Sequence, residues 1–232
     1  MVKKLKRLLI PEFWKIPKKK FKFTVSPRPG PHKKFECIPL LVIVRDILQL
    51  AESWKEARKI IKSKEVFVDG KVRKDHAYPC GLMDTISIPK INKYFRIVIG
   101  KKGLELKEIS EEDSKKKICK IVNKTCIKGK IQLNLHDGRN IQVEKNHFRT
   151  GDSVLIELPY QKILEYIKLE KDALALITKG SNAGKICKVK SLIKRKSLVE
   201  SSSVICEVDG KDFEIRKDFL IVIGKDKPVV EI

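Results

Sequence analysis

Three Asp-Gly dipeptides stand between short stretches in which apolar residues alternate with polar ones. They are Asp69-Gly70, Asp137-Gly138 and Asp209-Gly210. A tight hairpin turn needs positive φ angles, which glycine adopts freely and aspartate tolerates better than most residues. The spacing therefore predicts three β-hairpins along a chain of 232 residues, and a fold in which antiparallel strands recur.

The net charge restricts what such a chain can do. Against 29 Asp and Glu residues stand 52 Lys and Arg, which leaves a net charge of +23. Self-repulsion of this surplus opposes a compact state, so we expect the protein to work against a large polyanion. A membrane is disfavoured, because the longest apolar stretch, residues 38–44, is interrupted by Pro39 and is shorter than the about 18 residues that span a bilayer. Nucleic acid remains as the partner.

Nearly half of the surplus lies at the N-terminus, where residues 1–34 contain 12 Lys or Arg and one Glu. Five prolines in the same segment prevent a continuous helix or a central strand. Residues 1–37 are therefore expected to form an extended basic arm, whose aromatic residues could stack on bases or enter a neighbouring core. The alternative is a flexible, solvated tail. The aromatic residues are Phe13, Trp14, Phe21 and Phe23.

Residues 38–92 combine two helices with the first hairpin. Apolar residues recur every three or four positions up to Leu50, which is the helical period. Ser53 and Glu56 then form the pattern of a capping box, which predicts a second helix to about Ser63 with an apolar stripe and a strongly basic remainder. This helix, followed by the Asp69-Gly70 hairpin, resembles the αL RNA-binding domain of ribosomal, tRNA-charging and RNA-modifying proteins. The alternative is an ordinary helix with a solvated basic face.

The rest of the chain is expected to be mostly β. Residues 93–170 are predicted to form a β-rich central domain with one short helix near Ser110 to Lys117. Residues 171–224 carry a glycine loop at Thr178 to Lys185, which lacks the spacing of a phosphate-binding loop. The loop resembles a KOW motif, a small β-barrel module, although Cys187 stands where KOW sequences usually have glycine. Residues 225–232 form a short tail.

Taken in order, these segments resemble one family over nearly the whole chain, the archaeal and eukaryotic type of small-subunit ribosomal protein four (S-four-e). The resemblance rests on Leu5-Lys6-Arg7-Leu8, Pro29-Gly30-Pro31-His32, Ile38-Pro39-Leu40-Leu41, Gly81-Leu82-Met83-Asp84, Leu135-His136-Asp137-Gly138-Arg139 and Val222-Ile223-Gly224-Lys225-Asp226-Lys227-Pro228. It implies a multidomain α+β protein, made of the arm, the αL domain, the β-rich domain and a C-terminal KOW-type barrel. Because the chain ends soon after Pro228, it is similar to the archaeal form.

The sequence offers little for catalysis, metal binding or a cofactor. The four histidines have no metal partners at the usual spacing, and none stands beside a nucleophile motif. His136 is expected to serve as a turn residue or an RNA contact. The six cysteines lack zinc-ligand spacing, so we expect buried thiols in a reducing compartment. With no secretory signal pattern, the expected location is the cytoplasm, in the ribosome.

The leading hypothesis is a structural ribosomal protein, not an enzyme, that binds small-subunit rRNA and adjoins other small-subunit proteins. Affinity would be mainly electrostatic, and specificity would come from RNA shape. Two alternatives are an RNA-modifying enzyme such as a uridine isomerase, which needs a catalytic Asp within residues 93–170, and a KOW-bearing transcription elongation partner. The residues expected to contact RNA are Lys3, Lys4, Lys6, Arg7, Lys18, Lys19, Lys20, Arg28, Lys55, Arg58, Lys59, Lys62, Lys71, Arg73, Lys74, Lys179, Asn182 and Lys185.

Overall fold

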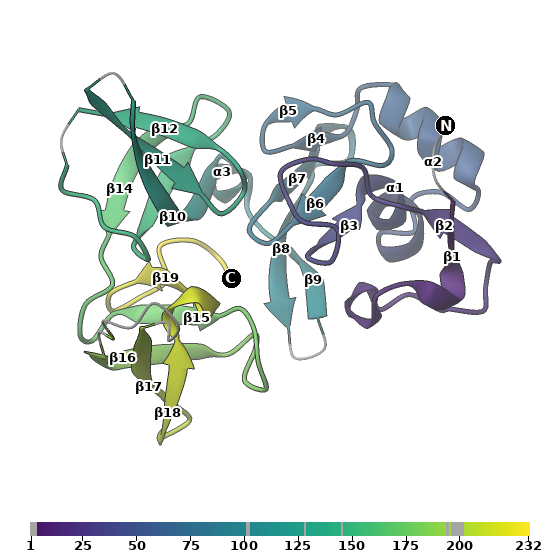
Figure 1. Cartoon of the computed structure of the whole chain (residues 1–232). Coiled ribbons are helices and arrows are strands. Elements are labelled where there is room, and N and C mark those ends of the chain that lie inside the picture. The colour runs from purple at the N-terminus through teal and green to yellow at the C-terminus, as the bar shows by residue number, and fades with distance from the viewer. Residues whose placement is uncertain (1–3, 101–102, 128, 145, 194, 196–201) are drawn as a thin grey trace. The chain divides into compact units, whose positions relative to one another are not determined.

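The computed structural model describes residues 4–100, 103–127, 129–144, 146–193, 195 and 202–232 (Figure 1). The chain divides into two compact units. The N-terminal unit comprises Met1–Val98 and Lys102–Lys115, and the C-terminal unit comprises Ile99–Lys101 and Lys116–Ile232. None of the described helices is long and apolar enough to cross a membrane.

The first residues of the chain fold back on the N-terminal unit. Strand β1 (Lys4–Lys6) pairs antiparallel with β2 (Phe23–Val25), and two short 3-10 turns, η1 (Arg7–Leu9) and η2 (Glu12–Trp14), lie between them. The Trp14 side chain is 1% exposed, and its Nε1 donates a hydrogen bond to the Cys37 carbonyl oxygen at 3.0 Å. The expected extended arm is thus a packed segment, because burial of its apolar side chains outweighs the repulsion among its lysines.

Two helical segments follow, as the periodicity predicts. Strand β3 (Cys37–Pro39) pairs with β6 (Pro79–Gly81) and leads into α1 (Leu40–Val42), which continues as the π-helical turn η3 (Ile43–Ile47). The helical run ends earlier than Leu50, since Gln49 has a φ of 53° and leaves the helix. Helix α2 (Trp54–Lys62) begins at the predicted Ser53 cap and buries Ala57 and Ile61.

A five-stranded sheet completes the N-terminal unit in the order β5-β4-β7-β8-β9. Its strands are β4 (Phe67–Val68), β5 (Lys71–Val72), β7 (Thr85–Ile88), β8 (Lys93–Gly100) and β9 (Gly103–Glu108). The turn between β4 and β5 has φ angles of 52° at Asp69 and 70° at Gly70, which confirms the predicted hairpin. Because β8 is paired with β7, the boundary between units lies beyond the predicted residue 92. Helix α3 (Glu111–Ser114) also belongs to this unit.

The C-terminal unit contains two antiparallel sheets of five strands, each with its own apolar core (Figure 1). The first has the order β12-β11-β10-β13-β14 and the second β18-β17-β16-β15-β19. The bounds are β10 (Lys116–Ile127), β11 (Lys130–Leu135), β12 (Asn140–Val143), β13 (Ser153–Glu157), β14 (Lys162–Ile167), β15 (Leu174–Ile177), β16 (Ile186–Ile193), β17 (Ser203–Val208), β18 (Lys211–Arg216) and β19 (Leu220–Gly224), with the 3-10 turn η5 (Lys217–Phe219) before β19.

The other two predicted hairpins are also present. Asp209 and Gly210 both have positive φ angles between β17 and β18, whereas between β11 and β12 the positive angle belongs to Gly138. The glycine loop predicted at residues 178–185 joins β15 to β16. The serine-rich loop expected near residues 194–203 lies largely outside the described residues.

Trp14 gives the sharpest test of how the first segment packs. Replacing Trp14 with alanine removes a buried indole and leaves the Cys37 carbonyl without its donor, so the free energy of unfolding should fall by about 3–5 kcal/mol. Urea unfolding followed by circular dichroism measures this. The matched variant Lys19→Ala, at an exposed position of the same segment, should change stability by less than about 0.5 kcal/mol. An alanine variant as stable as the parent would contradict the packing.

Candidate nucleic-acid interface

Helix α2 is held at its start by a capping box. The Ser53 hydroxyl accepts a hydrogen bond from the Glu56 backbone N–H at 3.2 Å. The Glu56 carboxylate accepts from the backbone N–H groups of Glu52 and Ser53, and these bonds lower the pKa of Glu56. The cap fixes the start of the helix, and burial of Ala57 and Ile61 sets which face is turned to the core. Lys55, Lys59 and Lys62 are exposed, and Arg58 is half-buried. The predicted RNA contacts on α2 are Lys55, Arg58, Lys59 and Lys62.

One basic residue of α2 stacks on an aromatic ring. The Arg58 guanidinium lies 5.1 Å from the centroid of the Trp54 ring, and Trp54 makes an edge-on contact with His76, with ring centroids 5.7 Å apart. Trp54, Arg58 and Lys62 are four residues apart, which places them on one face of the helix. The Trp54 side chain is 39% exposed, so the stack remains open to solvent in part.

His76 lies among cations. Burial lowers its pKa from the ordinary value, and the nearby charges of Arg58, Arg28 and Lys62 lower it further, while Asp75 acts in the opposite direction. Its Nδ1 lies 3.7 Å from an Asp75 carboxylate oxygen, which is too long for a hydrogen bond. Its buried Nε2 has no hydrogen-bond partner among the described residues.

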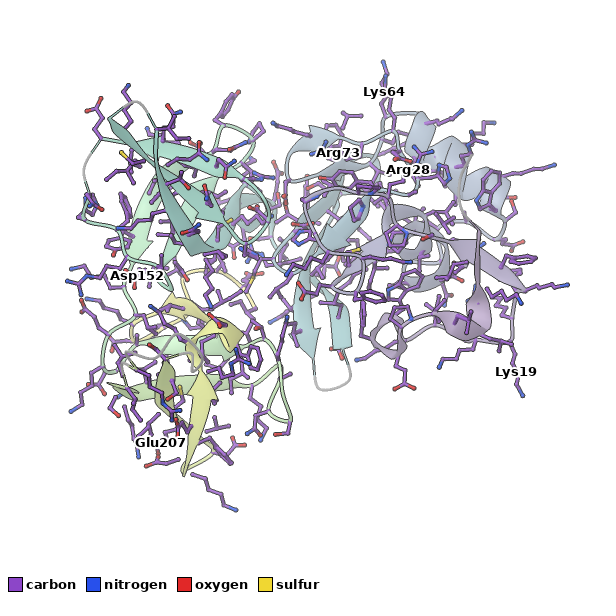
Figure 2. The ribbon with its side chains drawn as sticks, viewed as in Figure 1. Lys19, Arg28, Lys64, Arg73, Asp152 and Glu207 are labelled. Carbon is purple, nitrogen blue, oxygen red and sulfur yellow. The ribbon has the colours of Figure 1, made fainter. Side chains whose placement is uncertain are left out.

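Arg28 connects the first segment of the chain to this cluster. Its Nη1 donates to the Asp75 Oδ2 at 3.1 Å, and its backbone N–H donates to the Ala77 carbonyl at 3.0 Å. The guanidinium therefore lies beside His76 although 48 residues separate the two in sequence. Figure 2 shows Arg28 and Arg73 on the N-terminal unit.

The β4–β5 hairpin contributes a second group of cations. Lys71 and Lys74 are exposed, and the Arg73 guanidinium stacks 4.4 Å from the centroid of the Tyr78 ring. Burial raises the pKa of Tyr78 to about 12 despite the charge of Arg73, so the hydroxyl stays protonated. Asp69 anchors the turn, because its Oδ1 accepts a hydrogen bond from the Thr85 N–H at 2.9 Å. The predicted cations of this hairpin thus lie on an element whose turn is held by the hydrogen bond between Asp69 and Thr85.

Arg7 is not available to RNA, contrary to the prediction. Its side chain is fully buried, its Nη2 lies 2.9 Å from the Asp46 Oδ1, and its Nε donates to the Pro17 carbonyl. A buried carboxylate and carbonyl hold this charge inside the unit. The neighbouring Lys6, Lys18, Lys19 and Lys20 are exposed. Lys3 and the side chain of Lys4 lie outside the described residues.

The predicted contacts of the glycine loop belong to the C-terminal unit. The Lys179 ammonium lies 5.9 Å from the Phe219 ring centroid, and Asn182 is half-buried. The Lys185 Nζ lies 2.6 Å from the Asp209 Oδ2, so its charge is partly neutralised. All three residues belong to the loop between β15 and β16, in which Lys185 is already paired.

One group of potential metal ligands lies near the β11–β12 hairpin, formed by Cys119, His136 and Asp137. The Lys117 Nζ is 2.9 Å and the Arg139 Nε 3.2 Å from the Asp137 Oδ2, and both cations already neutralise this carboxylate. A metal ion would have to displace a buried ammonium, so the arrangement does not fit one. Of the six cysteines, five are buried as predicted, whereas Cys126 is exposed.

Sequence reasoning did not single out Trp54, His76 or Tyr78 as members of the interface. The spacing of Trp54, Arg58 and Lys62 was a signal that could have revealed the stack on α2. No local pattern pointed to His76, since its cationic neighbours come from two other segments of the chain, the first segment and α2.

Breaking the capping box of α2 should lower the stability of the protein. Ser53→Ala removes the acceptor for the Glu56 N–H, so the free energy of unfolding should decrease by about 1 kcal/mol. Thermal and urea unfolding provide the measurement. Lys55→Ala, on the same helix but outside the cap, is the matched control and should change stability by less than about 0.5 kcal/mol. Equal stability of the Ser53 variant and the parent would mean that the cap does not hold the helix.

The stability of the protein should depend on pH through the ionisation of Asp137. Burial raises the pKa of this carboxyl, but Lys117, His136 and Arg139 outweigh burial and lower it from 3.8 to about 2. Its contribution to stability is therefore complete above about pH 4 and lost as the pH falls through about 2. Asp137→Asn removes the carboxylate charge that contacts the buried Lys117 ammonium, which should cost about 3–5 kcal/mol near neutral pH.

Acid unfolding of the two proteins, followed by circular dichroism, checks this. As the pH falls towards 2, the free energy of unfolding of the parent should decrease by the contribution of Asp137. The Asp137→Asn variant should not show this part of the decrease. Asp212→Asn, at an exposed carboxylate on β18, should behave like the parent. A parent-like acid profile in the Asp137 variant would refute the assignment.

Three family models match the chain in succession. The RS4NT domain matches residues 1–35, the S4 domain residues 39–86, and the ribosomal family S4e model residues 91–163. The S4 domain match contains α2, His76 and the basic hairpin.

Relatives and a solved structure agree with these matches. The small ribosomal subunit protein eS4 of Methanothermobacter thermautotrophicus is 47% identical over 232 residues, which is 99% of this chain and 96% of the relative. The protein of the same name from Archaeoglobus fulgidus is 45% identical, over 98% of this chain and 97% of the relative. The crystal structure of the 30S ribosomal protein S4e from Thermoplasma acidophilum has a TM-score of 0.72 and 28% identity, and the match covers 82% of this chain and 96% of that one. The chain therefore belongs to the eS4 family of ribosomal proteins, in its archaeal form.

Proposed function

We propose that this protein is a structural constituent of the small ribosomal subunit, where it binds and stabilises rRNA. The observation that carries the proposal is the basic surface of the N-terminal unit, formed by α2 and the β4–β5 hairpin. Phosphate recognition needs cations held at fixed separations, and both elements are fixed by side-chain hydrogen bonds. The names of its relatives, small ribosomal subunit proteins, support the same role.

The binding is mainly electrostatic in this proposal. The net charge of +23 supplies attraction to any phosphate backbone, and the rigid elements select the shape of folded RNA. Arg28, from the first segment of the chain, adds its charge to the cluster around His76. The predicted contacts Lys6, Lys18, Lys19 and Lys20 are exposed and fit this role.

The second five-stranded sheet of the C-terminal unit is proposed to be the KOW-type module. Its glycine loop, with Lys179, Asn182 and Lys185, would add a smaller contact to rRNA or to a neighbouring small-subunit protein. The position where KOW sequences usually have glycine is filled by a thiol that packs inside, since Cys187 is buried and its Sγ donates to the Ala175 carbonyl at 3.4 Å. The proposed location is the ribosome in the cytoplasm.

The competing enzyme hypothesis depends on a catalytic aspartate in residues 93–170. Two aspartates of that region are buried, and both serve the fold. Asp137 neutralises Lys117 and Arg139. Asp152 accepts hydrogen bonds from the Tyr166 hydroxyl and from the Leu169 N–H. These partners favour structural roles for both carboxylates, in agreement with membership of a ribosomal protein family.

The salt dependence of rRNA binding tests the proposal. The affinity for small-subunit rRNA fragments should fall steeply as salt rises. The double variant Lys71→Ala, Lys74→Ala should reduce the logarithmic slope by about 1 for each phosphate that the protein no longer neutralises. Filter binding over a series of salt concentrations gives the slope. A flat response of the parent protein would contradict the electrostatic proposal.

Lys190→Ala is the matched control for this experiment. Its ammonium already lies 2.7 Å from the Asp212 Oδ1 and 3.2 Å from the Glu207 Oε2, so its removal should leave the slope unchanged. A slope that falls equally in both variants would show that the hairpin has no special part in binding.

A further inference from the structure

The face of α2 that carries Trp54, Arg58 and Lys62 differs from a plain basic surface. A helix that only attracts phosphate needs no exposed indole, and exposure of an indole to water is unfavourable. Here Trp54 remains 39% exposed beside Arg58, and it contacts His76, which lies near Arg28 and Lys62. The Arg58 guanidinium lies over the ring, 5.1 Å from its centroid, and Arg58 is half-buried. The pair therefore offers a flat surface for stacking and a donor for phosphate at the same place.

His76 packs against the Trp54 ring. Its ring meets Trp54 edge-on at 86°, which restricts the orientation of the indole. The buried nitrogens His76 Nε2 and Arg58 Nε have no hydrogen-bond partner among the described residues. Polar atoms that are buried without a partner are uncommon in folded proteins and are usually satisfied by a water, an ion or another bound group. Arg28 and Lys62 add positive charge near His76, and Asp75, which pairs with Arg28, adds one negative charge.

We propose that Arg28, Trp54, Arg58, Lys62 and His76, here called the Trp54 site, bind a single unpaired nucleotide of the RNA. The base stacks on the Trp54–Arg58 pair, and the adjoining phosphate accepts hydrogen bonds from Arg28, Arg58 and Lys62, while His76 positions the indole. The inference rests on the proposed function and adds to it the class of RNA element. A base within a duplex has both faces covered by its neighbours, so only an unpaired base in a bulge, a loop or a single-stranded overhang can occupy the site.

Two RNA probes of equal length distinguish this from general phosphate binding. One is a hairpin whose loop contains an unpaired 2-aminopurine, and the other is a fully paired duplex. Trp54→Leu should weaken binding to the hairpin by roughly tenfold, because the stacking surface is removed, and should leave binding to the duplex unchanged. Trp54→Phe keeps a smaller ring and should fall between the parent and the leucine variant. Circular dichroism and urea unfolding confirm that each variant is folded.

Fluorescence provides an independent readout. The chain contains two tryptophans, of which Trp14 is buried and Trp54 is partly exposed. Binding of the hairpin should quench the intrinsic fluorescence and the 2-aminopurine signal of the parent protein, and both changes should vanish in Trp54→Leu. Tyr160→Leu, which removes an aromatic residue that is 83% exposed in the C-terminal unit, is the matched control and should bind both probes like the parent.

The outcomes separate the nucleotide site from the proposed function. If the parent binds neither RNA, the proposed function fails together with this inference. If the parent binds both RNAs, but Trp54→Leu loses affinity for both equally or for neither, the nucleotide site is refuted while rRNA binding stands. Selective loss of affinity for the hairpin, together with loss of quenching, supports the Trp54 site.

Discussion

Neutralisation of buried cations by a limited number of carboxylates governs this structure. With 52 basic and 29 acidic residues, the chain cannot pair every cation, and it places several acids where a positive charge is buried. Asp46 contacts the buried Arg7 and Arg45, and Asp137 contacts the buried Lys117. Removal of either acid would take away the carboxylate that contacts a buried ammonium or guanidinium, which costs several kcal/mol. The surplus of positive charge is consequently on the surface, where RNA can reach it.

Features set by neighbouring residues could be predicted from the sequence. The Asp69-Gly70 turn needs only two residues that accept positive φ, and the start of α2 needs only Ser53 and Glu56. The basic face of that helix follows from its period. In each case the interaction that determines the structure lies within a few positions, so the local pattern contains the information.

Features that depend on distant partners could not be predicted. The first segment looks like a free arm from its prolines and lysines, yet Trp14 bonds to the carbonyl of Cys37 and Arg7 pairs with Asp46. The position of His76 among Arg28, Arg58 and Lys62 likewise depends on how three segments meet. The role of Arg7 was also predicted wrongly from residue type alone. An arginine in a basic segment indicates an RNA contact, but Arg7 is buried in the core.

The anchoring of the first segment has a consequence for synthesis on the ribosome. Lys15 forms an ion pair with Glu105, and Gly103 lies so close to the Phe13 backbone that any side chain there would collide with it. Lys15 leaves the exit tunnel before its partner Glu105, which follows 90 residues later. The first segment therefore cannot reach its final conformation until β9 has emerged, and until then its lysines can meet other polyanions.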